Sequence, residues 1–425
     1  MKKGISLLLC IGMVSSLLMG CGTDTSTTQE ETLQEKKKSK TDETIELMTG
    51  TAVDTALYKE YEKMVEGFAK ENPEALTIEL IPSSTDHEGE VKTRLGGGNI
   101  PDMWMTHGWS LGRYSEYLLD LQEQEWAKDV SPLLTDIMFD KNGEIYALPL
   151  NIDIAGILYN QDVIEEAGFK VEDIKTWEDF NEVCIAVKAN GKIPIYNAGK
   201  DRWPTGLYVD WIAPTFFTEE DNQNMLAGNF VADKYSDTLA VVEGFANSDF
   251  FNPDYSSATS DDVSRAIAQG DAAFSFIMNF ALVTAYEYAP DGNLGFMPIP
   301  NANGKEPYTV CGEKDAIGIA KDGKNVETCV EFLNYLAKPE NIAALATSSG
   351  QMAGLASASS ELGALSKSLE NAEKYPGVPY FDRVYMPSGS WDAIVATTEM
   401  IVTKQKTLEE AMTQIEKEYD SLIKK

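Results

Sequence analysis

One stretch, Gly143–Phe180, constrains the fold of this 425-residue chain more than any other. It contains two apolar runs, Ile145–Leu150 and Ile152–Tyr159, which are rich in isoleucine and leucine. Long apolar runs of this kind are typical of central strands that are covered on both faces. The runs meet at Asn151 and Asp153, and a carboxylate among apolar residues needs a partner. The order strand, polar interruption, strand predicts a chain that crosses between two α/β lobes.

Helix signals follow this crossing directly. A short helix is expected at Gln161–Ala167, with Gly168 as its stop. A second helix is expected to begin after Thr176, because Asp179 lies three residues on and the two form a capping box. The crossing therefore leads into an α/β region.

The folded part begins with a strand, a helix and a second strand, at Thr44–Met48, Thr55–Lys70 and Leu76–Ile81. Such a crossover is expected to be right-handed and to join parallel strands. A polar helix at Asp86–Leu95 and a short strand at Met103–Met105 follow. Open α/β sheets bind ligands at the carboxyl ends of their strands, so the residues that follow this last strand are candidates for a binding site.

The later elements are predicted in the same way, from the periodicity of apolar residues and from residues that start or stop helices and strands. In chain order, we expect short helices at Tyr114–Leu121 and Trp126–Leu134, an apolar helix around Trp211, a helix at Asp261–Gln269, a turn and strand at Gly270–Phe274, a strand at Gly295–Pro300, a helix at Val326–Leu336 and a last helix from Thr407. Two further segments, Tyr308–Ala320 and Gly350–Gly354, are interpreted as additional crossings between the lobes.

The charge of the chain excludes several classes of partner. The chain has 35 basic and 68 acidic residues, which gives a net charge of −33. A nucleic-acid-binding protein would present lysine and arginine to the phosphates. Docking of the folded body on anionic lipid is disfavoured for the same reason. An apolar content of 43% supports substantial cores in a chain of this length.

The N-terminus is a separate segment. Lys2 and Lys3 precede an apolar run, Ile5–Met19, that is too short to span a bilayer comfortably, so residues 1–20 are interpreted as an export signal. The sequence Leu-Met-Gly-Cys ending at Cys21 resembles a bacterial lipobox, which implies that Cys21 carries a lipid. Residues 21–42 contain little to bury and are interpreted as a disordered tether.

The sequence offers little support for catalysis. Only two histidines occur, His87 and His107, and no metalloprotease, nucleophile-elbow or phosphate-loop motif is present. The three cysteines that follow the tether, Cys184, Cys311 and Cys329, are an odd set without CxxC spacing, and we expect no structural disulfide.

The opening stretch resembles a known family. The matching pieces are Tyr146 to Pro149, Tyr159-Asn160, Ala167-Gly168, and Thr176-Trp177 with Phe180. In order and spacing they resemble the extracellular solute-binding proteins of ABC transporters, sugar-binding type (family 1). With weaker blocks elsewhere, the resemblance extends over about residues 43–425.

The resemblance implies a fold. It is an α/β, two-lobed periplasmic-binding-protein-like fold of type II, in which each lobe is a mixed sheet flanked by helices and hinge crossings join the lobes. Lobe 1 would comprise residues 43–151 and 314–349, and lobe 2 would comprise residues 152–313 and 350–425. The lobes would close over a solute by a hinge.

Carbohydrate binding requires particular side chains. Flat aromatic rings match the apolar C–H faces of a sugar, and fixed polar groups, carboxylates among them, bond its hydroxyls. A site built to bond a hydroxyl rejects an analogue that lacks it. Of seven tryptophans, Trp109, Trp203 and Trp391 lie in loops that contain Gly, Pro or Ser, where exposure is expected.

The resemblance implies roles for individual residues. Trp391 coincides with a sugar-stacking tryptophan of the family and Asp153 with an acidic sugar ligand. Trp109 aligns with a polar sugar contact, and we infer a stacking role for it. Phe280 takes the place of an aromatic residue at the cleft. The alternatives are that Trp391 packs a helix start and that Asp153 caps a turn. Further candidate ligand contacts are Thr51, Thr106, Arg202, Trp203 and Gly312.

The predicted function is a lipid-anchored extracellular protein that captures a carbohydrate, in particular an oligosaccharide, and delivers it to the permease of an ABC importer. The expected partners are the carbohydrate, the permease subunits and the membrane through the N-terminal lipid only. We expect a monomer without cofactor, metal or catalytic residues. Two alternatives stay open: a secreted glycoside hydrolase that uses Asp153 and a second carboxylate, and the same fold with a polyamine or a glycerol phosphodiester as solute.

Overall fold

The computed structural model describes residues 44–82, 87–302, 304–372 and 374–424. The predictions for the signal at residues 1–20, the lipidated Cys21 and the tether at residues 21–42 lie outside the described residues. Within the described ranges, no helix combines the length and the apolar character needed to cross a bilayer.

The first sheet is mixed and has the strand order β2-β1-β3-β11-β4. Its strands are β1 (Thr44–Met48), β2 (Thr77–Ile81), β3 (Met103–Met105), β4 (Leu148–Pro149) and β11 (Ala316–Ile319). β1 pairs in parallel with β2 and β3, whereas β11 is antiparallel to β3 and β4. The predicted strand–helix–strand start with parallel strands is therefore confirmed, with α1 (Ala56–Glu71) as the connecting helix.

The second sheet is also mixed and has the order β7-β8-β6-β9. Its strands are β6 (Ile157–Asn160), β7 (Ile193–Ile195), β8 (Ala272–Phe276) and β9 (Leu294–Met297). β7 and β8 are parallel, and β6 is antiparallel to both β8 and β9.

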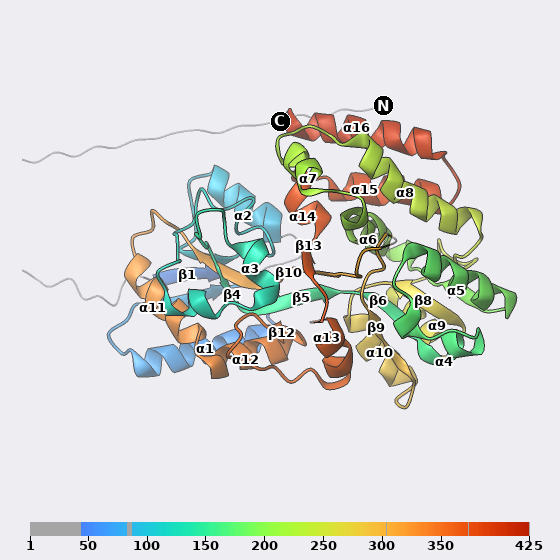
Figure 1. The fold of residues 1–425 in the computed structure, drawn as a ribbon. Helices are drawn as coiled ribbons and strands as arrows, with labels where there is room; N and C mark the ends of the chain where they lie inside the picture. Colours follow the sequence, from blue (N-terminus) through green and yellow to red (C-terminus); the bar gives the residue numbers. More distant parts are fainter. Residues whose placement is uncertain (1–43, 83–86, 303, 373, 425) are drawn as a thin grey trace, which may run out of the picture. The chain divides into compact units, whose positions relative to one another are not determined.

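A third sheet, of order β12-β5-β10-β13, lies between the other two (Figure 1). Its strands are β5 (Asn151–Ala155), β10 (Thr309–Glu313), β12 (Met352–Ala353) and β13 (Gly377–Pro379). All three segments predicted as crossings contribute a strand to it. β5 and β10 are antiparallel, with Asp153 opposite Gly312. The exact lobe boundaries stay a prediction.

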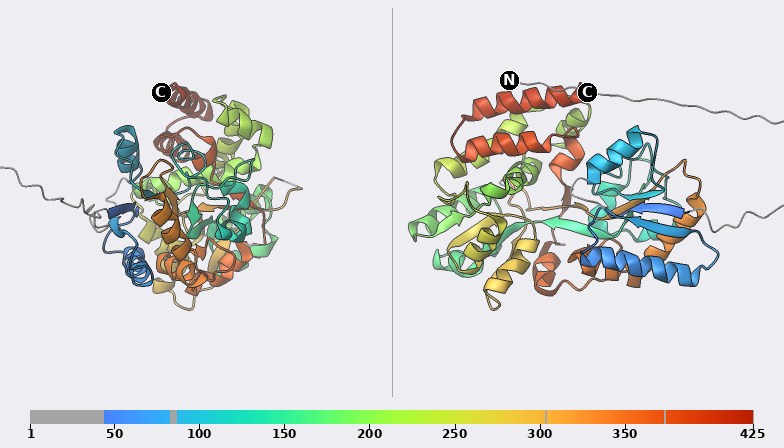
Figure 2. Two further views of the ribbon diagram at one scale, coloured as in Figure 1. Left: turned by 90° about the vertical axis from the view of Figure 1, so that its left-hand side faces the viewer. Right: turned by 180° about the vertical axis from the view of Figure 1, so that it is seen from behind.

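Helices flank the sheets and complete the fold (Figures 1 and 2). Besides α1 they are α2 (His87–Gly96), α3 (Pro132–Met138), α4 (Gln161–Glu166), α5 (Trp177–Ala189), α6 (Trp203–Ile212), α7 (Glu219–Leu226), α8 (Ala232–Asn247), α9 (Ser260–Ala268), α10 (Phe280–Tyr288), α11 (Val326–Leu336), α12 (Pro339–Ser349), α13 (Ser366–Ala372), α14 (Phe381–Tyr385), α15 (Trp391–Val402) and α16 (Leu408–Ile423), with short 3-10 turns at Glu125–Asp129, Val171–Asp173, Gly199–Asp201, Ala213–Thr215 and Gly363–Leu365.

Helix starts follow the capping signals in the sequence. The predicted box at Thr176 and Asp179 is formed at the start of α5, and the box at Thr407 and Glu410 is formed at the start of α16. In each box the threonine oxygen accepts the N–H of the acidic residue, whose carboxylate accepts the N–H of the threonine. These two helix starts are confirmed.

The helix predicted at Tyr114–Leu121 is wrong. This segment forms turns, because Leu118 makes an isolated bridge with Ala320 and the N–H of Leu119 donates to the carbonyl of Ile319. The helix predicted at Trp126–Leu134 is divided into a 3-10 turn and α3, because Pro132 starts a new helix.

The cores hold the residues that the apolar patterns assigned to them. Trp104 and Trp211 are fully buried, as expected for tryptophans in apolar runs. Cys184, Cys311 and Cys329 are free and buried, so the prediction that they form no disulfide is confirmed for these three residues.

Candidate ligand-binding site

A cavity of about 440 Å³ is lined by side chains from distant parts of the chain. This volume falls within the range of small-molecule sites. We call it the tryptophan cavity; its lining residues are Glu88, His107, Trp109, Arg113, Asp153, Trp203, Leu207, Asp210, Met278, Tyr380, Asp382, Arg383, Gly389 and Trp391.

Four of the predicted ligand contacts lie in the wall of this cavity. They are Trp109, from the loop after β3, Trp203 and Trp391, the first residues of α6 and α15, and Asp153 from β5. The three tryptophans are the ones that the sequence placed in loops with Gly, Pro or Ser. Their partly exposed rings supply flat apolar surface, which suits a ligand with apolar faces.

The loop after β3 positions Trp109. His107 and Gly108 both have positive φ values, 48° and 80°, which turn the chain sharply at the end of the strand. A Cβ atom on Gly108 would lie 2.9 Å from the side chain of Arg383, so glycine permits this close approach. The Nδ1 atom of His107 lies 3.2 Å from the carbonyl oxygen of Lys314. Burial lowers the pKa of His107 to about 3, and its ring is therefore neutral at physiological pH.

A second unusual backbone position precedes Trp203. Arg202 has a φ of 63°, which is uncommon for a residue with a side chain, and it immediately precedes the first residue of α6. Pro204 then occupies an early position of the helix, where proline is well tolerated. These features fix where Trp203 enters the cavity wall.

Trp391 packs against the same helix. A Cβ atom on Gly206 of α6 would lie 2.8 Å from the Trp391 ring, so glycine allows the ring to rest on the helix backbone. Trp391 is also the first residue of α15. Trp391 therefore packs at a helix start and also lines the cavity, while its stacking on a sugar stays a prediction.

Two arginines form ion pairs in the cavity wall. The Arg383 guanidinium lies 3.0 Å from the Asp153 carboxylate and stacks on the Tyr380 ring, 3.9 Å from its centroid. Arg113 lies 2.7 Å from Glu88 and stacks on the ring of Trp109 at 4.4 Å. Each arginine thus pairs with an acid and also stacks on an aromatic ring. The Oδ1 atom of Asp153 is enclosed and has no hydrogen-bond partner among the described residues, which leaves unused acceptor capacity on this carboxylate.

Two further acids in the wall have raised pKa values. Asp210 is 2% exposed, and burial together with the nearby charge of Asp382 raises its pKa to about 7. Burial raises the pKa of Asp382 to about 6, although Arg113 and Arg383 oppose the shift. These carboxyl groups therefore titrate near neutral pH.

The other predicted contacts do not lie in the cavity wall. Thr106 is fully buried and its hydroxyl donates to the carbonyl of Ala316. Gly312 lies behind Tyr380, whose ring would be 3.4 Å from a Cβ atom there. The Phe280 ring is 47% exposed and lies 6.0 Å from the Trp203 ring. Arg202 is exposed, and the hydroxyl of Thr51 lies 3.0 Å from that of Thr55 at the start of α1.

Sequence reasoning missed several residues of the wall. Asp210 carried a usable signal, because it is the lone charged residue of an otherwise apolar helix. Asp382 and Arg383 carried no such signal, because they belong to a short helix without a recognisable periodicity, and Tyr380 immediately precedes this helix. Their role depends on contacts with β5 and α6 that only the fold creates.

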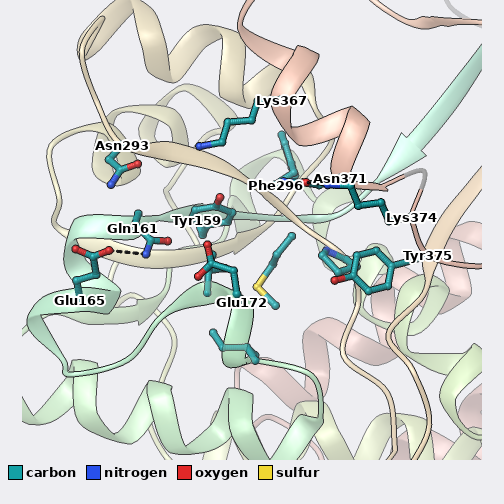
Figure 3. Close-up of a pocket in the computed structure, with 14 residues that line it drawn as sticks. Tyr159, Gln161, Glu165, Glu172, Asn293, Phe296, Lys367, Asn371, Lys374 and Tyr375 are labelled. Atoms are coloured by element: carbon teal, nitrogen blue, oxygen red, sulfur yellow. Dashed lines mark hydrogen bonds between the residues drawn. The ribbon is translucent and has the colours of Figure 1, made fainter.

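A second cavity of about 450 Å³ lies elsewhere, beside β6, β9 and α13 (Figure 3). Tyr159 lies at its centre, with Lys367 on one side and Glu172 on the other (Figure 3). It contains none of the predicted ligand contacts. No cluster of potential metal ligands occurs in the part of the chain that the structure describes.

Comparison with known families identifies the chain. The family described as "Bacterial extracellular solute-binding protein" matches residues 51–343, which is more than half of the sequence. The chain belongs to the bacterial extracellular solute-binding proteins.

Among the relatives of this solute-binding protein is the melibiose/raffinose/stachyose-binding protein MelE of Bacillus subtilis. The two are 25% identical over 342 residues, which cover 79% of each chain.

Solved structures are similar along nearly the whole chain. A binding protein of Bacillus subtilis in an open conformation has a TM-score of 0.84 and 23% identity, with 90% of this chain and 98% of that chain covered. A sugar transporter protein of Bacillus licheniformis in complex with stachyose has a TM-score of 0.72 and 26% identity, with coverage of 89% and 100%. The predicted family and the two-lobed α/β fold are therefore confirmed.

Proposed function

We propose that this solute-binding protein captures an oligosaccharide in the tryptophan cavity and delivers it unchanged to the permease of an ABC importer. One observation carries the proposal. Trp109, Trp203 and Trp391 meet the acids Asp153 and Asp382 in a single cavity, which provides stacking surfaces and hydroxyl acceptors together.

The comparisons support a particular class of saccharide. The relative from Bacillus subtilis is named for melibiose, raffinose and stachyose, and stachyose occupies the related structure from Bacillus licheniformis. All three sugars end in a galactosyl unit. We therefore expect galactose-terminated oligosaccharides to bind this chain.

Calorimetric titration tests the proposal directly. Raffinose and stachyose should bind with one site per chain, whereas maltotriose should bind more weakly, because a site that is built for one pattern of hydroxyls leaves its polar groups unpaired with another. Failure of every saccharide in a broad panel to bind would contradict the proposal.

A polyamine is a second candidate solute. The cavity wall contains four carboxylates, Glu88, Asp153, Asp210 and Asp382, but only two arginines. Several acids beside aromatic rings are also what a cationic amine requires. Spermidine therefore belongs in the same titration panel, and its binding in place of the saccharides would assign the cavity to a cation.

The alternative of a glycoside hydrolase is tested with the same protein and the same sugar. A glycoside hydrolase would convert stachyose to smaller sugars. Chromatography after prolonged incubation should recover the oligosaccharide unchanged. Release of product, abolished by Asp153→Asn, would favour the hydrolase instead.

The lipid anchor is part of the proposal. Cys21→Ser in the full-length chain should move the protein from the membrane fraction to the medium or the soluble extracellular fraction. Ser16→Ala, in the apolar part of the signal, is the matched control and should leave the protein with the membranes. Membrane retention of the Cys21→Ser protein would contradict lipidation.

A further inference from the structure

Asp210 and Asp382 form a close acidic pair in the wall of the tryptophan cavity. The Oδ1 atom of Asp210 accepts the backbone N–H of Asp382 at 2.8 Å, which holds the two residues together. The Oδ1 atom of Asp382 is enclosed and has no hydrogen-bond partner among the described residues. Both residues line the cavity that would hold the solute.

The cations nearby are committed to other acids. Arg383 pairs with Asp153 at 3.0 Å, and Arg113 pairs with Glu88 at 2.7 Å. His107, which also lines the cavity, is neutral because its pKa is lowered to about 3. Both arginines near the acidic pair are therefore already paired with other acids in the part of the chain that the structure describes.

The groups that face Asp210 come from several elements. Asp382 and Arg383 approach from α14, Tyr380 from the residue before it, Asp153 from β5 and Tyr235 from α8. Of these, only Arg383 is positively charged. Asp382 also lies near Arg113 and near Glu88 of α2, whose charges have opposite effects on it. The pKa of about 7 for Asp210 agrees with this geometry. Two interacting carboxyl groups of this kind titrate as a pair.

A bound neutral solute changes the electrostatics of the pair. It expels water from the cavity, and loss of water disfavours a second negative charge. A proton on one of the two carboxyl groups also supplies an O–H donor, which an oxygen of a sugar can accept. Both effects favour the protonated pair in the filled cavity.

We propose that the Asp210–Asp382 pair takes up a proton as the cavity binds a neutral saccharide. The inference rests on the proposed function, since it assumes a neutral solute. This proton uptake makes the affinity for the solute depend on pH, with tighter binding at lower pH. A cationic solute would have the opposite effect, because it favours two ionised carboxylates.

Calorimetry of the wild-type protein with stachyose tests the proposal. Near pH 7, titrations in buffers of different ionisation enthalpy should show net proton uptake. The affinity for stachyose should fall from pH 6 to pH 9. The total fall should be about tenfold for each unit by which binding raises the pKa of the pair. Proton release, or an affinity that is constant over this range, would overturn the inference while leaving saccharide binding intact. No binding at any pH would overturn both this inference and the proposed function.

Two variants test whether this pair, and not another buried acid, causes the pH dependence of binding. Asp210→Asn removes one of the two titrating carboxyl groups, so the affinity for stachyose, whatever its value, should depend less steeply on pH above pH 7. Asp315→Asn is the matched control, because Asp315 is also a buried acid with a raised pKa but does not line the cavity. The control should keep the wild-type pH profile. A wild-type profile in Asp210→Asn would overturn the assignment, and the wild-type calorimetry decides the matter if either variant fails to fold.

Discussion

Each tryptophan of the cavity is held in place by an unusual neighbour. Trp109 follows the positive-φ residues His107 and Gly108, Trp203 follows Arg202, and Trp391 rests on Gly206. Sparsely populated backbone conformations persist where the surroundings enforce them, and they concentrate at functional sites. His107 and Arg202 have such conformations, and they precede two of the three tryptophans in the cavity wall.

Removal of the Trp391 ring tests that role. Trp391→Ala should weaken oligosaccharide binding by about 1–3 kcal/mol, because a stacked aromatic ring provides much of the contact with a sugar face. Tyr288→Ala is the control, since Tyr288 is an exposed aromatic residue of α10 that does not line the cavity. Equal affinities for the two variants in calorimetry would exclude Trp391 from the binding surface.

Substitution of two glycines tests whether the packing of the Trp391 ring on α6 matters for binding. Gly206→Ala should displace the Trp391 ring and lower affinity, because the new methyl group would lie 2.8 Å from it. Gly244→Ala, within α8, meets no atom within 4 Å and should raise the free energy of unfolding by about 1 kcal/mol, as alanine is the better helix former. Affinity and chemical denaturation should be measured for both. Unchanged affinity in Gly206→Ala would show that the ring position is not critical.

Some residues of the cavity wall could be predicted from the sequence, and others could not. The tryptophans could be found because Gly, Pro and Ser mark loops, and loops expose side chains. Asp153 could be found because a carboxylate is conspicuous between apolar runs. Arg383 could not be found, since its partner Asp153 lies 230 residues away along the chain. The two segments meet because β10 pairs with β5 on one side and with β13, which precedes Arg383, on the other.

At the scale of the elements, capping chemistry was a dependable guide. The starts of α5 and α16 were predicted from a threonine with an acidic residue three positions on, because that interaction is local. The wrong prediction at Tyr114–Leu121 has the opposite cause. There, pairing with the segment after β11 overrides a local helical pattern, and this pairing spans about two hundred residues.

The cap of α16 offers a quantitative test. Thr407→Ala should lower the free energy of unfolding by about 1 kcal/mol, because the hydroxyl no longer accepts the N–H of Glu410. Thr413→Ala, an exposed position inside the same helix, should have a smaller effect or a slightly stabilising one. Urea denaturation measures both. Equal losses would mean that the capping bond contributes nothing specific.

At the scale of the molecule, the cavity depends on contacts between segments that are remote in sequence. Its wall extends from Glu88 of α2 to Trp391 of α15, and the pairing of β5, β10 and β13 in the middle sheet brings Asp153 and the segment of Arg383 to the same place. The sequence could predict the family and the fold, because several short motifs occur in the expected order. It could not predict the depth of the cavity or its acidic pair, because these depend on how the segments pack.

A crystal structure of the folded part with stachyose tests the central claim most directly. Our account predicts sugar rings stacked on Trp391 and at least one other tryptophan of the cavity, with ligand hydroxyls bonded to Asp153 or Asp382. Stachyose bound instead in the cavity around Tyr159 and Lys367, with the tryptophan cavity empty, would contradict it.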